Sequence, residues 1–530
     1  MALVATCGVS GLIEPTETRY AAIARAMLDG GDWLVPRLNG IPHFHKPPVA
    51  YWLSAGGMAA LGANEWGARI AVALAAGAVL WCTGRIAARA GSRVGPGGPG
   101  ASAGAPAPLI LASSALFFAL SRQLASDVFL AAAVAGFHAA WFGERSRRGL
   151  WPFVALGVGF MAKGPVVLVL TVLPVLLAAA WTRRGALSRP LASRRGWLLF
   201  ALVALPWYLV CAARTPGLLS YFLGNQVWVR YATTEHQRGG PPWYFVPVLL
   251  GGALPWTWIA LRGAARAWRA AGETRRSTAA VAGPAGESGA LLLAWILGPF
   301  LFFSFSGSKL PAYLLPAFPA VAVLAARGMD GAGRGWRAVT ALTLAALGSA
   351  AAAALVLFRP GGTALAPGLL LAGIGAAAGL LASAALAARA RWAWSAGLAL
   401  GALLALAVTT RSIDGAMGSP RALVELLKSE RGTDEPVVEF AHFNAGLPFY
   451  LGETVLLLEV PRERLFVDER ALGRIRIERA GLPALARDAG GVWILGPERA
   501  TRGMLDELGL GAELRARWKG EALFLARPGG

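Results

Sequence analysis

The sequence predicts an all-α polytopic membrane protein that carries a small α/β domain at its C-terminal end. Its 530 residues are 56% hydrophobic and only 15% charged, with a mean hydropathy of +0.54, which is far too apolar for an ordinary soluble domain. Apolar segments long enough to cross a bilayer recur through the first 410 residues. We therefore expect about 12 to 13 transmembrane helices in residues 1–410, followed by a soluble domain in residues 411–530.

The positive charge of the chain lies mainly in short connections between these apolar segments. The formal net charge is +21, and arginine-rich connections such as "TRRGALSRPLASRRG" and "RGMDGAGRGWR" alternate with connections that hold few basic residues. Basic connections stay in the cytoplasm by the positive-inside rule. We therefore expect the other connections, with residues 14–67 and 411–530, to face outward from the membrane. Because topology accounts for the charge, we expect no nucleic-acid partner.

Apolar windows give the positions of the expected spans. They lie near residues 68–89, 106–121, 125–142, 150–162, 164–181, 196–213, 243–262, 289–306, 311–326, 337–358, 368–388 and 391–410. The pattern changes after that point. Short β-rich runs such as "PVVEFAHF" and "GVWILGP" alternate with helical segments such as "RALVELLKSE", which predicts a small α/β domain on the outer face.

The outward stretch of residues 14–67 is unusually polar for this chain. It contains a predicted amphipathic helix, Thr18 to Leu28, which ends at a pair of glycines and is expected to lie along the membrane surface. A second helix is expected to begin at "KPPVAYWL", where a proline suits the first turn and Lys46 stands just outside it. This segment forms an interfacial shelf that carries Glu17, Arg19, His45 and Lys46.

Other outward connections add charged and aromatic groups at the bilayer edge. Such groups are costly there unless they are paired or used, so their convergence favours a site for an anionic, lipid-bearing substrate. A lysine or arginine beside an aromatic belt would hold a lipid phosphate while the lipid tail stays in the bilayer. The residues are Asp127, Lys163, Arg230, His236, Arg238, Lys309 and Tyr313.

Five separated motifs connect this pattern to a known family. The stretch from Glu14 to Trp52, "EPTETRYAAIARAMLDGGDWLVPRLNGIPHFHKPPVAYW", resembles the first outer loop of the bacterial aminoarabinose transferases. Further on, "RQLASDVFLAA", "MAKGPVVLVL", "PPWYFVPVLLGGALPW" and "FSFSGSKLPAYLLP" match that family in order and spacing. The resemblance covers residues 11–330 in detail.

The resemblance implies a GT-C glycosyltransferase of the bacterial plasma (inner) membrane. Such an integral membrane enzyme uses a polyprenyl-phosphate sugar and shares its architecture with protein O-mannosyltransferases. It implies that the outer loop, the Asp127 loop and the Lys309 to Tyr313 loop frame the cavity where the sugar is transferred with inversion. Two departures stand out. Thr16-Glu17 replaces the family's Asp-Glu, and His45-Lys46-Pro47 replaces its Glu-Lys-Pro.

Each candidate residue receives a role that suits its chemistry. Transfer needs the charge of the leaving phosphate to be neutralised and the acceptor oxygen to be positioned or deprotonated. The candidates for acceptor activation are Glu17 and Asp127. Those for the donor phosphate are Lys46, Arg230, Arg238 and Lys309. Those for other substrate contacts are Arg19, Tyr20, Lys163 and Tyr313. His45 and His236 are candidate ligands of a divalent metal, for which no third ligand is spaced in the sequence.

Structural explanations stand beside these functional ones. Glu17 could simply favour a helix N-terminus through the helix dipole, and Asp127 could cap a helix. Lys46 could extend to the interface, and Tyr313 could belong to the aromatic belt. Lys163 and Lys309 could equally anchor the protein or contact substrate.

Three functions remain open at the level of sequence. The leading one is transfer of a sugar from a polyprenyl-phosphate donor to an envelope acceptor, either a lipid A-like glycolipid or a protein. A lipid or sugar permease should show internal repeats and broken helices with midplane charges. The last is an inactive family member whose outer domain binds glycan. The sequence names neither the sugar nor the acceptor.

Overall fold

The computed structural model describes residues 2–90, 106–143, 149–222, 224, 239–276, 284–357, 367–409, 414–461 and 469–529. The chain divides into two compact units, which are described separately. The helical unit comprises Met1–Thr6 and Val72–Thr409, and the mixed unit comprises Cys7–Ala71 and Thr410–Gly530. The outer loop therefore groups with the C-terminal domain, whereas the sequence suggests a single boundary at residue 410.

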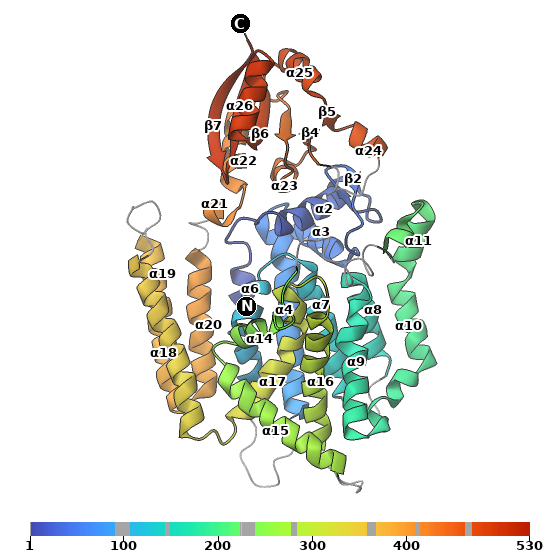
Figure 1. The fold of residues 1–530 in the computed structure, drawn as a ribbon, viewed down its shortest axis with the longest axis vertical. Helices are drawn as coiled ribbons and strands as arrows, with labels where there is room; N and C mark the ends of the chain where they lie inside the picture. Colours follow the sequence, from blue (N-terminus) through green and yellow to red (C-terminus); the bar gives the residue numbers. More distant parts are fainter. Residues whose placement is uncertain are drawn as a thin grey trace. The chain divides into compact units, whose positions relative to one another are not determined.

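The helical unit is built from helices and short 3-10 turns (Figure 1). Its elements are α1 (Ala2–Ala5), most of α4 (Glu65–Ala90), α5 (Pro106–Ala112), α6 (Ala115–Leu120), α7 (Ser126–Trp141), α8 (Trp151–Lys163), α9 (Val166–Thr182), η2 (Gly185–Leu187), η3 (Arg189–Ala192), α10 (Arg194–Ala204), α11 (Pro206–Arg214), α12 (Leu218–Ser220), α14 (Phe245–Gly252), α15 (Thr257–Arg276), α16 (Pro284–Ser304), η5 (Pro311–Ala317), α17 (Phe318–Met329), α18 (Arg334–Leu357), α19 (Pro367–Ala388) and α20 (Trp392–Thr409).

Many of these helices are long and apolar enough to cross a bilayer, which confirms a multi-pass membrane protein. Within the described residues five pass this test alone: Glu65–Ala90, Gly286–Ser304, Pro311–Met329, Arg334–Ala354 and Leu369–Ala388. Two bent pairs, α10 with α11 and α14 with α15, raise the number to as many as seven.

The bends explain why the spans expected from sequence do not all appear as single helices. Proline lacks the N–H that would continue a helical ladder. Pro206 begins α11, so the expected span of residues 196–213 breaks there by 43°. Pro255 lies between α14 and α15, which meet at 107°. Several other expected spans correspond to apolar helices of 10–17 residues.

The helices α15 and α17 approach each other at backbone distance. A Cβ atom at Gly263 of α15 would overlap the carbonyl oxygen of Leu324, and one at Gly328 of α17 would overlap that of Ile259. Glycine is therefore required at this crossing because no side chain separates the two helices. The close approach fixes the C-terminal end of α17 against α15.

The mixed unit combines the outer loop with an α/β domain. Its elements are α2 (Thr16–Gly30), β1 (Arg37–Leu38), β2 (Ile41–Pro42), α3 (Val49–Leu61), α21 (Asp414–Met417), α22 (Arg421–Glu430), β3 (Val437–Phe440), α23 (Gly446–Leu451), β4 (Leu456–Leu458), α24 (Glu469–Gly473), β5 (Arg476–Ile477), η9 (Arg479–Gly481), α25 (Leu482–Ala489), β6 (Val492–Pro497), α26 (Glu498–Glu507), β7 (Leu510–Trp518) and β8 (Glu521–Pro528).

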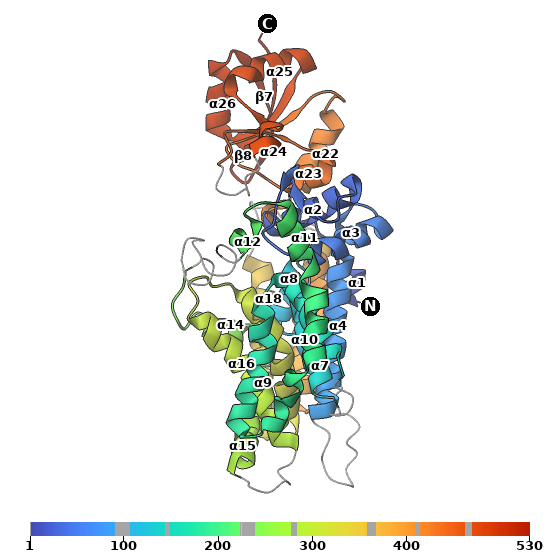
Figure 2. The ribbon, with the colours of Figure 1, turned by 90° about the vertical axis from the view of Figure 1, so that its right-hand side faces the viewer.

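Six of these strands form one mixed sheet in the order β5-β4-β3-β6-β8-β7. The strands β3, β4, β5 and β6 pair in parallel, and β8 pairs antiparallel with β6 and β7. Figure 2 shows α22 and α26 on opposite sides of this sheet. One hydrophobic core contains Leu423 and Trp493, and the other contains Met504 and Phe524. This arrangement confirms the predicted α/β domain.

The predicted surface helix exists but lies in a different environment. The structure forms α2 over Thr16–Gly30 and ends it at Gly31, which has the left-handed conformation. Its apolar residues Tyr20, Ile23 and Met27 are buried, and α2 packs against α3 and α23. The apolar face of α2 is thus covered by protein. Pairing with α3 and α23, which sequence periodicity does not reveal, replaces the expected contact with lipid.

We expect Gly263→Ala to destabilise the protein by about 1–3 kcal/mol, because the added methyl group forces α15 away from α17. Gly272→Ala is a matched control on the same helix, since a Cβ there meets no atom within 4 Å. It should be neutral or stabilising by up to about 1 kcal/mol through helix propensity. Thermal unfolding of the two purified variants tests this, and equal melting temperatures would contradict the close packing.

Candidate functional site

Two predicted site residues of the helical unit form an ion pair. Asp127 lies in the first turn of α7, and Lys163 is the last residue of α8. The Lys163 ammonium contacts Asp127 Oδ1, and both side chains keep about one seventh of their surface exposed, at 14% and 16%. Each charge suits its helix end, because an acid is favoured at an N-terminus and a cation at a C-terminus. The helix ends thus bring the two motifs together.

The segment from Ser306 to Tyr313 completes this cluster. The Lys163 Nζ lies 5.2 Å from the centre of the Tyr313 ring, over its face. The Tyr313 hydroxyl is 3.3 Å from Ser308 Oγ, and Lys309, which is buried, donates to the backbone oxygen of Ser306 at 2.6 Å. The turn η5 that carries Tyr313 packs against α7. Asp127, Lys163 and Tyr313 therefore lie together in one cluster.

This cluster can bind and orient more than one kind of polar group. Lysine ammonium groups attract phosphate oxygens, and the tyrosine hydroxyl can donate or accept a hydrogen bond. The Asp127 carboxylate can accept a proton from a nearby hydroxyl. Gly240 packs closely against the side chains of Lys309 and Tyr244, since a Cβ there would approach both at 3.2 Å. The cluster thus combines cations, a carboxylate and hydroxyl groups at helix ends.

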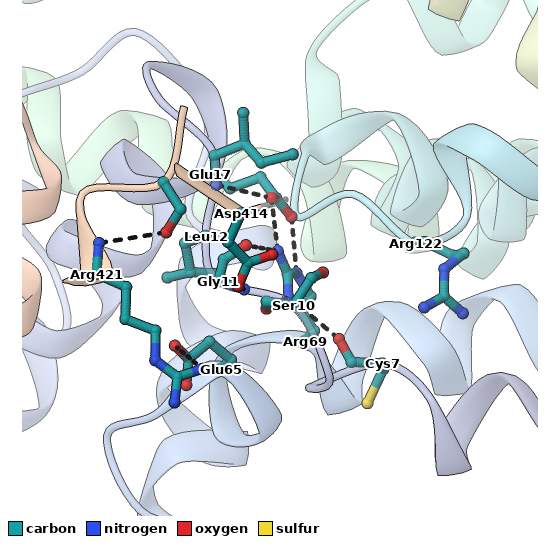
Figure 3. A network of polar contacts seen from close by, with 12 residues as sticks. Cys7, Ser10, Gly11, Leu12, Glu17, Glu65, Arg69, Arg122, Asp414 and Arg421 are labelled. Carbon is teal, nitrogen blue, oxygen red and sulfur yellow. Dashed lines mark hydrogen bonds and ion pairs between the residues drawn. The ribbon is translucent and has the colours of Figure 1, made fainter. Parts of the chain in front are cut away.

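In the mixed unit, Glu17 is held by an arginine that the sequence analysis did not single out. Arg69 Nε donates to Glu17 Oε1 at 2.8 Å, and Arg69 Nη2 donates to Glu17 Oε2 at 2.7 Å (Figure 3). Both side chains are almost wholly buried. The remaining guanidinium hydrogens go to the backbone oxygens of Cys7, Ser10 and Gly11. All five N–H donors of Arg69 are therefore satisfied.

This geometry favours a structural role for Glu17. Its two oxygens face Arg69, and Glu17 Oε2 also accepts the backbone N–H of Ile13 at 3.0 Å. A carboxylate whose two oxygens are both held in a buried bidentate pair is not free to contact a substrate hydroxyl without leaving the guanidinium charge unpaired. Of the two carboxylates proposed for acceptor activation, Asp127 is consequently the better placed.

The phosphate candidate Lys46 follows a short hairpin in the mixed unit. Strands β1 and β2 are joined by Asn39 and Gly40, both with positive φ, as a tight hairpin turn requires. Lys46 and His45 are half-buried, and the predicted helix after them is α3. The predicted substrate contacts in this unit are Arg19 and Tyr20. Arg19 is half-buried, and Tyr20 is buried with its ring centre 5.3 Å from that of Tyr51.

His43, which the sequence analysis overlooked, lies beside Lys46. Its ring is 4.0 Å from the ring of His45 and is buried, and its Nε2 has no hydrogen-bond partner among the described residues. Burial, with the nearby positive charges of His45, Arg19 and Lys46, holds the pKa of His43 well below its usual value. A neutral ring with an unsatisfied nitrogen next to cationic side chains fits an anionic ligand.

The outer loop is bonded to the C-terminal domain within the mixed unit. Tyr450 accepts the backbone N–H of Leu12 at 2.9 Å and donates to Glu65 at 3.0 Å. Asp414 accepts the backbone N–H of Gly11 at 2.6 Å. Asn39 exchanges two hydrogen bonds of 2.9 Å with the backbone of Val455. These contacts fix the loop that carries Lys46 to the domain.

Two carboxyl groups, the half-buried Glu14 and the buried Glu439, lie at the junction of loop and domain. Glu14 accepts the backbone N–H of Gly446, and Glu439 on β3 accepts that of Asn444. Burial raises the pKa of Glu14 to about 7. The neighbouring Thr18, Gly446, Arg19 and Lys519 lower this pKa by smaller amounts. Burial also raises the pKa of Glu439 well above its usual value, and the charge of Glu14 adds to this rise.

Three predicted site residues, Arg230, His236 and Arg238, lie outside the described residues. The metal prediction for His45 and His236 is therefore untested. In the part of the chain that the structure describes, no three side chains of His, Cys, Asp or Glu are grouped so as to hold a metal ion.

The raised pKa values predict that acid stabilises the mixed unit. A carboxyl whose pKa is higher in the folded state than its ordinary value of 4.5 favours folding at low pH, and this contribution is lost as the pH rises through about 7. The melting temperature should therefore fall between about pH 5 and about pH 8. Glu14→Gln should reduce the fall, whereas Glu425→Gln, at an exposed position, should not. Equal pH profiles for all three proteins would contradict the burial of Glu14.

The buried pair predicts strong coupling between Glu17 and Arg69. Removing one partner leaves a buried charge, so Arg69→Met should cost about 3–5 kcal/mol. Glu17→Gln should also destabilise, and the double variant should cost clearly less than the sum of the two. Unfolding of the four proteins in detergent measures the coupling, and additive effects would show that the pair does not hold the loop.

Comparisons with known proteins agree with the motifs. Residues 7–222 match the family described as dolichyl-phosphate-mannose-protein mannosyltransferase. The chain is 34% identical over 331 residues to an undecaprenyl phosphate-alpha-4-amino-4-deoxy-L-arabinose arabinosyl transferase of Pseudomonas fluorescens, which is 59% of this chain and 53% of that protein. A transferase of the same description from Erwinia tasmaniensis is 32% identical over 368 residues, 65% of this chain and 61% of that protein. The chain spans about half the length of the first of these relatives.

Solved structures show the same fold over nearly the whole chain. ArnT from Cupriavidus metallidurans bound to undecaprenyl phosphate has a TM-score of 0.79 at 22% identity, over 99% of this chain and 96% of that chain. Its apo state has a TM-score of 0.81 at 21% identity, over 99% and 95%. The chain thus has the GT-C fold and is similar to the aminoarabinose transferases, as its motifs indicate.

Proposed function

We propose that this protein transfers a sugar from a polyprenyl-phosphate donor to an acceptor of the cell envelope. The observation that carries this proposal is the cluster of Asp127, Lys163 and Tyr313 at adjoining helix ends. The cluster lies in a fold whose solved relative binds undecaprenyl phosphate. Relatives similar in sequence are arabinosyl transferases that use an undecaprenyl-phosphate sugar.

The cationic residues suit the leaving group. During transfer, an acceptor oxygen attacks the anomeric carbon on the face opposite the phosphate, and the bond from this carbon to the phosphate oxygen breaks. The bonding electrons leave with the polyprenyl phosphate, whose added negative charge must be neutralised. In the helical unit we assign this task to Lys163 and Lys309. Lys46 of the mixed unit is a separate candidate for binding the donor phosphate and is tested on its own below.

The acceptor proton is the remaining requirement. If the acceptor is a hydroxyl group, its proton passes to the Asp127 carboxylate as the new bond forms. An acceptor phosphate is already ionised and needs no base. Lys163 then holds Asp127 in place while the hydroxyl of Tyr313 contacts the sugar. This assignment uses Asp127 because Glu17 is engaged by Arg69.

The acceptor and the orientation complete the proposal. We propose a lipid A-like glycolipid as the acceptor, since the relatives similar in sequence are aminoarabinose transferases, with a protein hydroxyl as the second candidate. We also propose that the cluster and the mixed unit face outward from the inner membrane. Arginine-rich connections on the other side support this orientation.

Mass spectrometry of envelope lipids and glycoproteins tests the function directly. Cells with and without the gene should differ by one sugar on a lipid A-like glycolipid. A sugar lost only from proteins would shift the acceptor to the second candidate. Identical envelope glycans in the two strains, with the protein present in the membrane, would overturn the proposed transfer.

Asp127→Asn should lower turnover by roughly 10²- to 10⁴-fold if the acceptor is a hydroxyl group, because general base assistance is worth that much. Donor binding should be nearly unchanged. Asp488→Asn, at an exposed position of α25, is the control and should keep full turnover. Initial rates with a radiolabelled donor measure the effect, and normal turnover of the Asp127 variant would exclude a catalytic base at this position.

Lys46→Ala should weaken donor binding by about 1–3 kcal/mol, the range for losing a hydrogen bond to a charged group. Lys428→Ala removes the same charge from an exposed position of α22 and should leave the affinity unchanged. Binding of undecaprenyl phosphate to the purified variants measures the difference. Equal affinities would remove Lys46 from the phosphate site.

A further inference from the structure

The helix α15 has three chemically distinct faces. At about 100° per residue, its buried residues Ile259, Gly263 and Ala267 lie on one face, toward the protein. A second face exposes the large apolar side chains of Trp258 (42% exposed), Leu261 (44%) and Trp268 (58%). The third face lies next to this apolar face and carries a row of arginines, Arg262, Arg266 and Arg269, with the acid Glu273 among them.

Further cations gather where this arginine row meets the turn between α17 and α18. Arg262 donates to the backbone oxygens of Gly328, Asp330 and Gly331, and Arg266 donates to those of Arg327 and Asp330. Arg327 lies in the last turn of α17 and Arg334 begins α18. Among the described residues of this turn, Asp330 is the acid that faces these cations.

Arg337 lies in the first turn of α18, directly after the turn of residues 327–334. Trp258 of α15 donates to Thr343 of α18 at 3.1 Å, which sets the two helices side by side. Arg262 lies one turn further along α15, about 6 Å from this contact. Arg337 lies about 9 Å from it, toward the start of α18. Both displacements are toward the turn between α17 and α18. Arg337 Nε is buried and has no hydrogen-bond partner among the described residues.

The carbonyl contacts do not use the full capacity of this cluster. Arg262 makes three hydrogen bonds to backbone oxygens and Arg266 makes two, whereas each guanidinium has five N–H donors. The contacts of Arg262 and Arg266 are accounted for by capping of α17, because cations are favoured at the C-terminal end of a helix. It does not explain Arg269, which is exposed on the same face. The cluster therefore has donors and charge left for an anion.

We propose that the arginine face of α15, with the turn of residues 327–334, binds the phosphate of an anionic phospholipid. The adjoining apolar face would receive the acyl chains against Trp258, Leu261 and Trp268. Basic clusters between membrane helices on the cytoplasmic side recognise such headgroups. The two arginine-rich connections around α15 and the turn are the segments that the positive-inside rule assigns to that side.

The proposal is independent of sugar transfer and is tested by lipid binding. Purified full-length protein is titrated with phosphatidylglycerol and, separately, with phosphatidylcholine, and bound lipid is counted by native mass spectrometry. Wild-type protein should bind phosphatidylglycerol preferentially. The double variant Arg266→Gln and Arg269→Gln should lose roughly 10- to 30-fold in affinity for it, at about fivefold per arginine.

A control that removes the same charge elsewhere tests whether the lipid binds at this cluster or is attracted by positive charge in general. Arg389→Gln with Arg391→Gln removes the same charge from the exposed turn between α19 and α20 and should change the affinity less than about twofold. Arg266 also contacts the turn, so its replacement could disturb the fold. The single variant Arg269→Gln avoids this problem and should still lower the affinity for phosphatidylglycerol about fivefold. Wild-type affinity in the single Arg269 variant would overturn the proposal.

A second arm distinguishes a lipid from a free anion. Inorganic phosphate, added at matched ionic strength, should not displace phosphatidylglycerol. If phosphate displaces the lipid fully and raises the melting temperature of the protein as much as the lipid does, the cluster binds free phosphate and the lipid proposal fails. Equal binding of phosphatidylglycerol and phosphatidylcholine would contradict the proposal as well.

Discussion

The buried guanidinium of Arg69 is the constraint on which the mixed unit depends. A buried cation must be paired, and Arg69 meets this demand with both oxygens of Glu17 and with three backbone oxygens from Cys7 to Gly11. The backbone before α2 is thereby turned so that its carbonyls face the arginine. The N–H groups of Gly11 and Leu12 then point to Asp414 and Tyr450 of the C-terminal domain.

This arrangement links residues far apart in sequence through one short segment. Residues 10–13 form hydrogen bonds to Arg69 on one side and to the C-terminal domain on the other. A shift of the loop would therefore break both sets of bonds together. The same loop continues into α2 and the hairpin that precedes Lys46. The C-terminal domain therefore serves to hold the loop, in addition to any contact that it makes with an acceptor.

The satisfaction of polar groups separates structural charges from functional ones. Arg69 has no donor left for a ligand, and Glu17 is committed to it. The pair of Asp127 and Lys163 is partly exposed, and its lysine also lies over the ring of Tyr313. His43 is buried with an unsatisfied nitrogen beside cationic side chains. Both of these places retain hydrogen-bonding capacity, and the proposed base Asp127 belongs to the first of them.

Sequence reasoning predicted the membrane class, the α/β domain and the motif residues, because hydropathy and local spacing are encoded locally. It predicted Asp127 and Lys163 as site residues but not their direct pairing, which requires the ends of α7 and α8 to meet. It missed Arg69, although an arginine inside an otherwise apolar stretch is a signal that a buried partner exists. It expected α2 on lipid, because its partner α23 lies more than 400 residues further along the chain.

Glu17 illustrates the limit of motif matching. Its place next to Thr16 makes it the nearest acid to the position of the family's missing carboxylate, and its role depends on a residue outside that motif. Only the three-dimensional contact with Arg69 shows that its charge is already compensated. Pro206 and Pro255 show the same limit. Both prolines are visible in the sequence, but the number of spans depends on how the helices on either side of each proline are oriented.

The most direct test of the central claim is a single-turnover reaction of the purified protein with a polyprenyl-phosphate sugar and a lipid A-like acceptor. The account predicts one free polyprenyl phosphate for each sugar found on the acceptor, with the opposite anomeric configuration to the donor. Release of polyprenyl phosphate without a glycosylated acceptor, or a product with retained configuration, would contradict direct transfer by this protein.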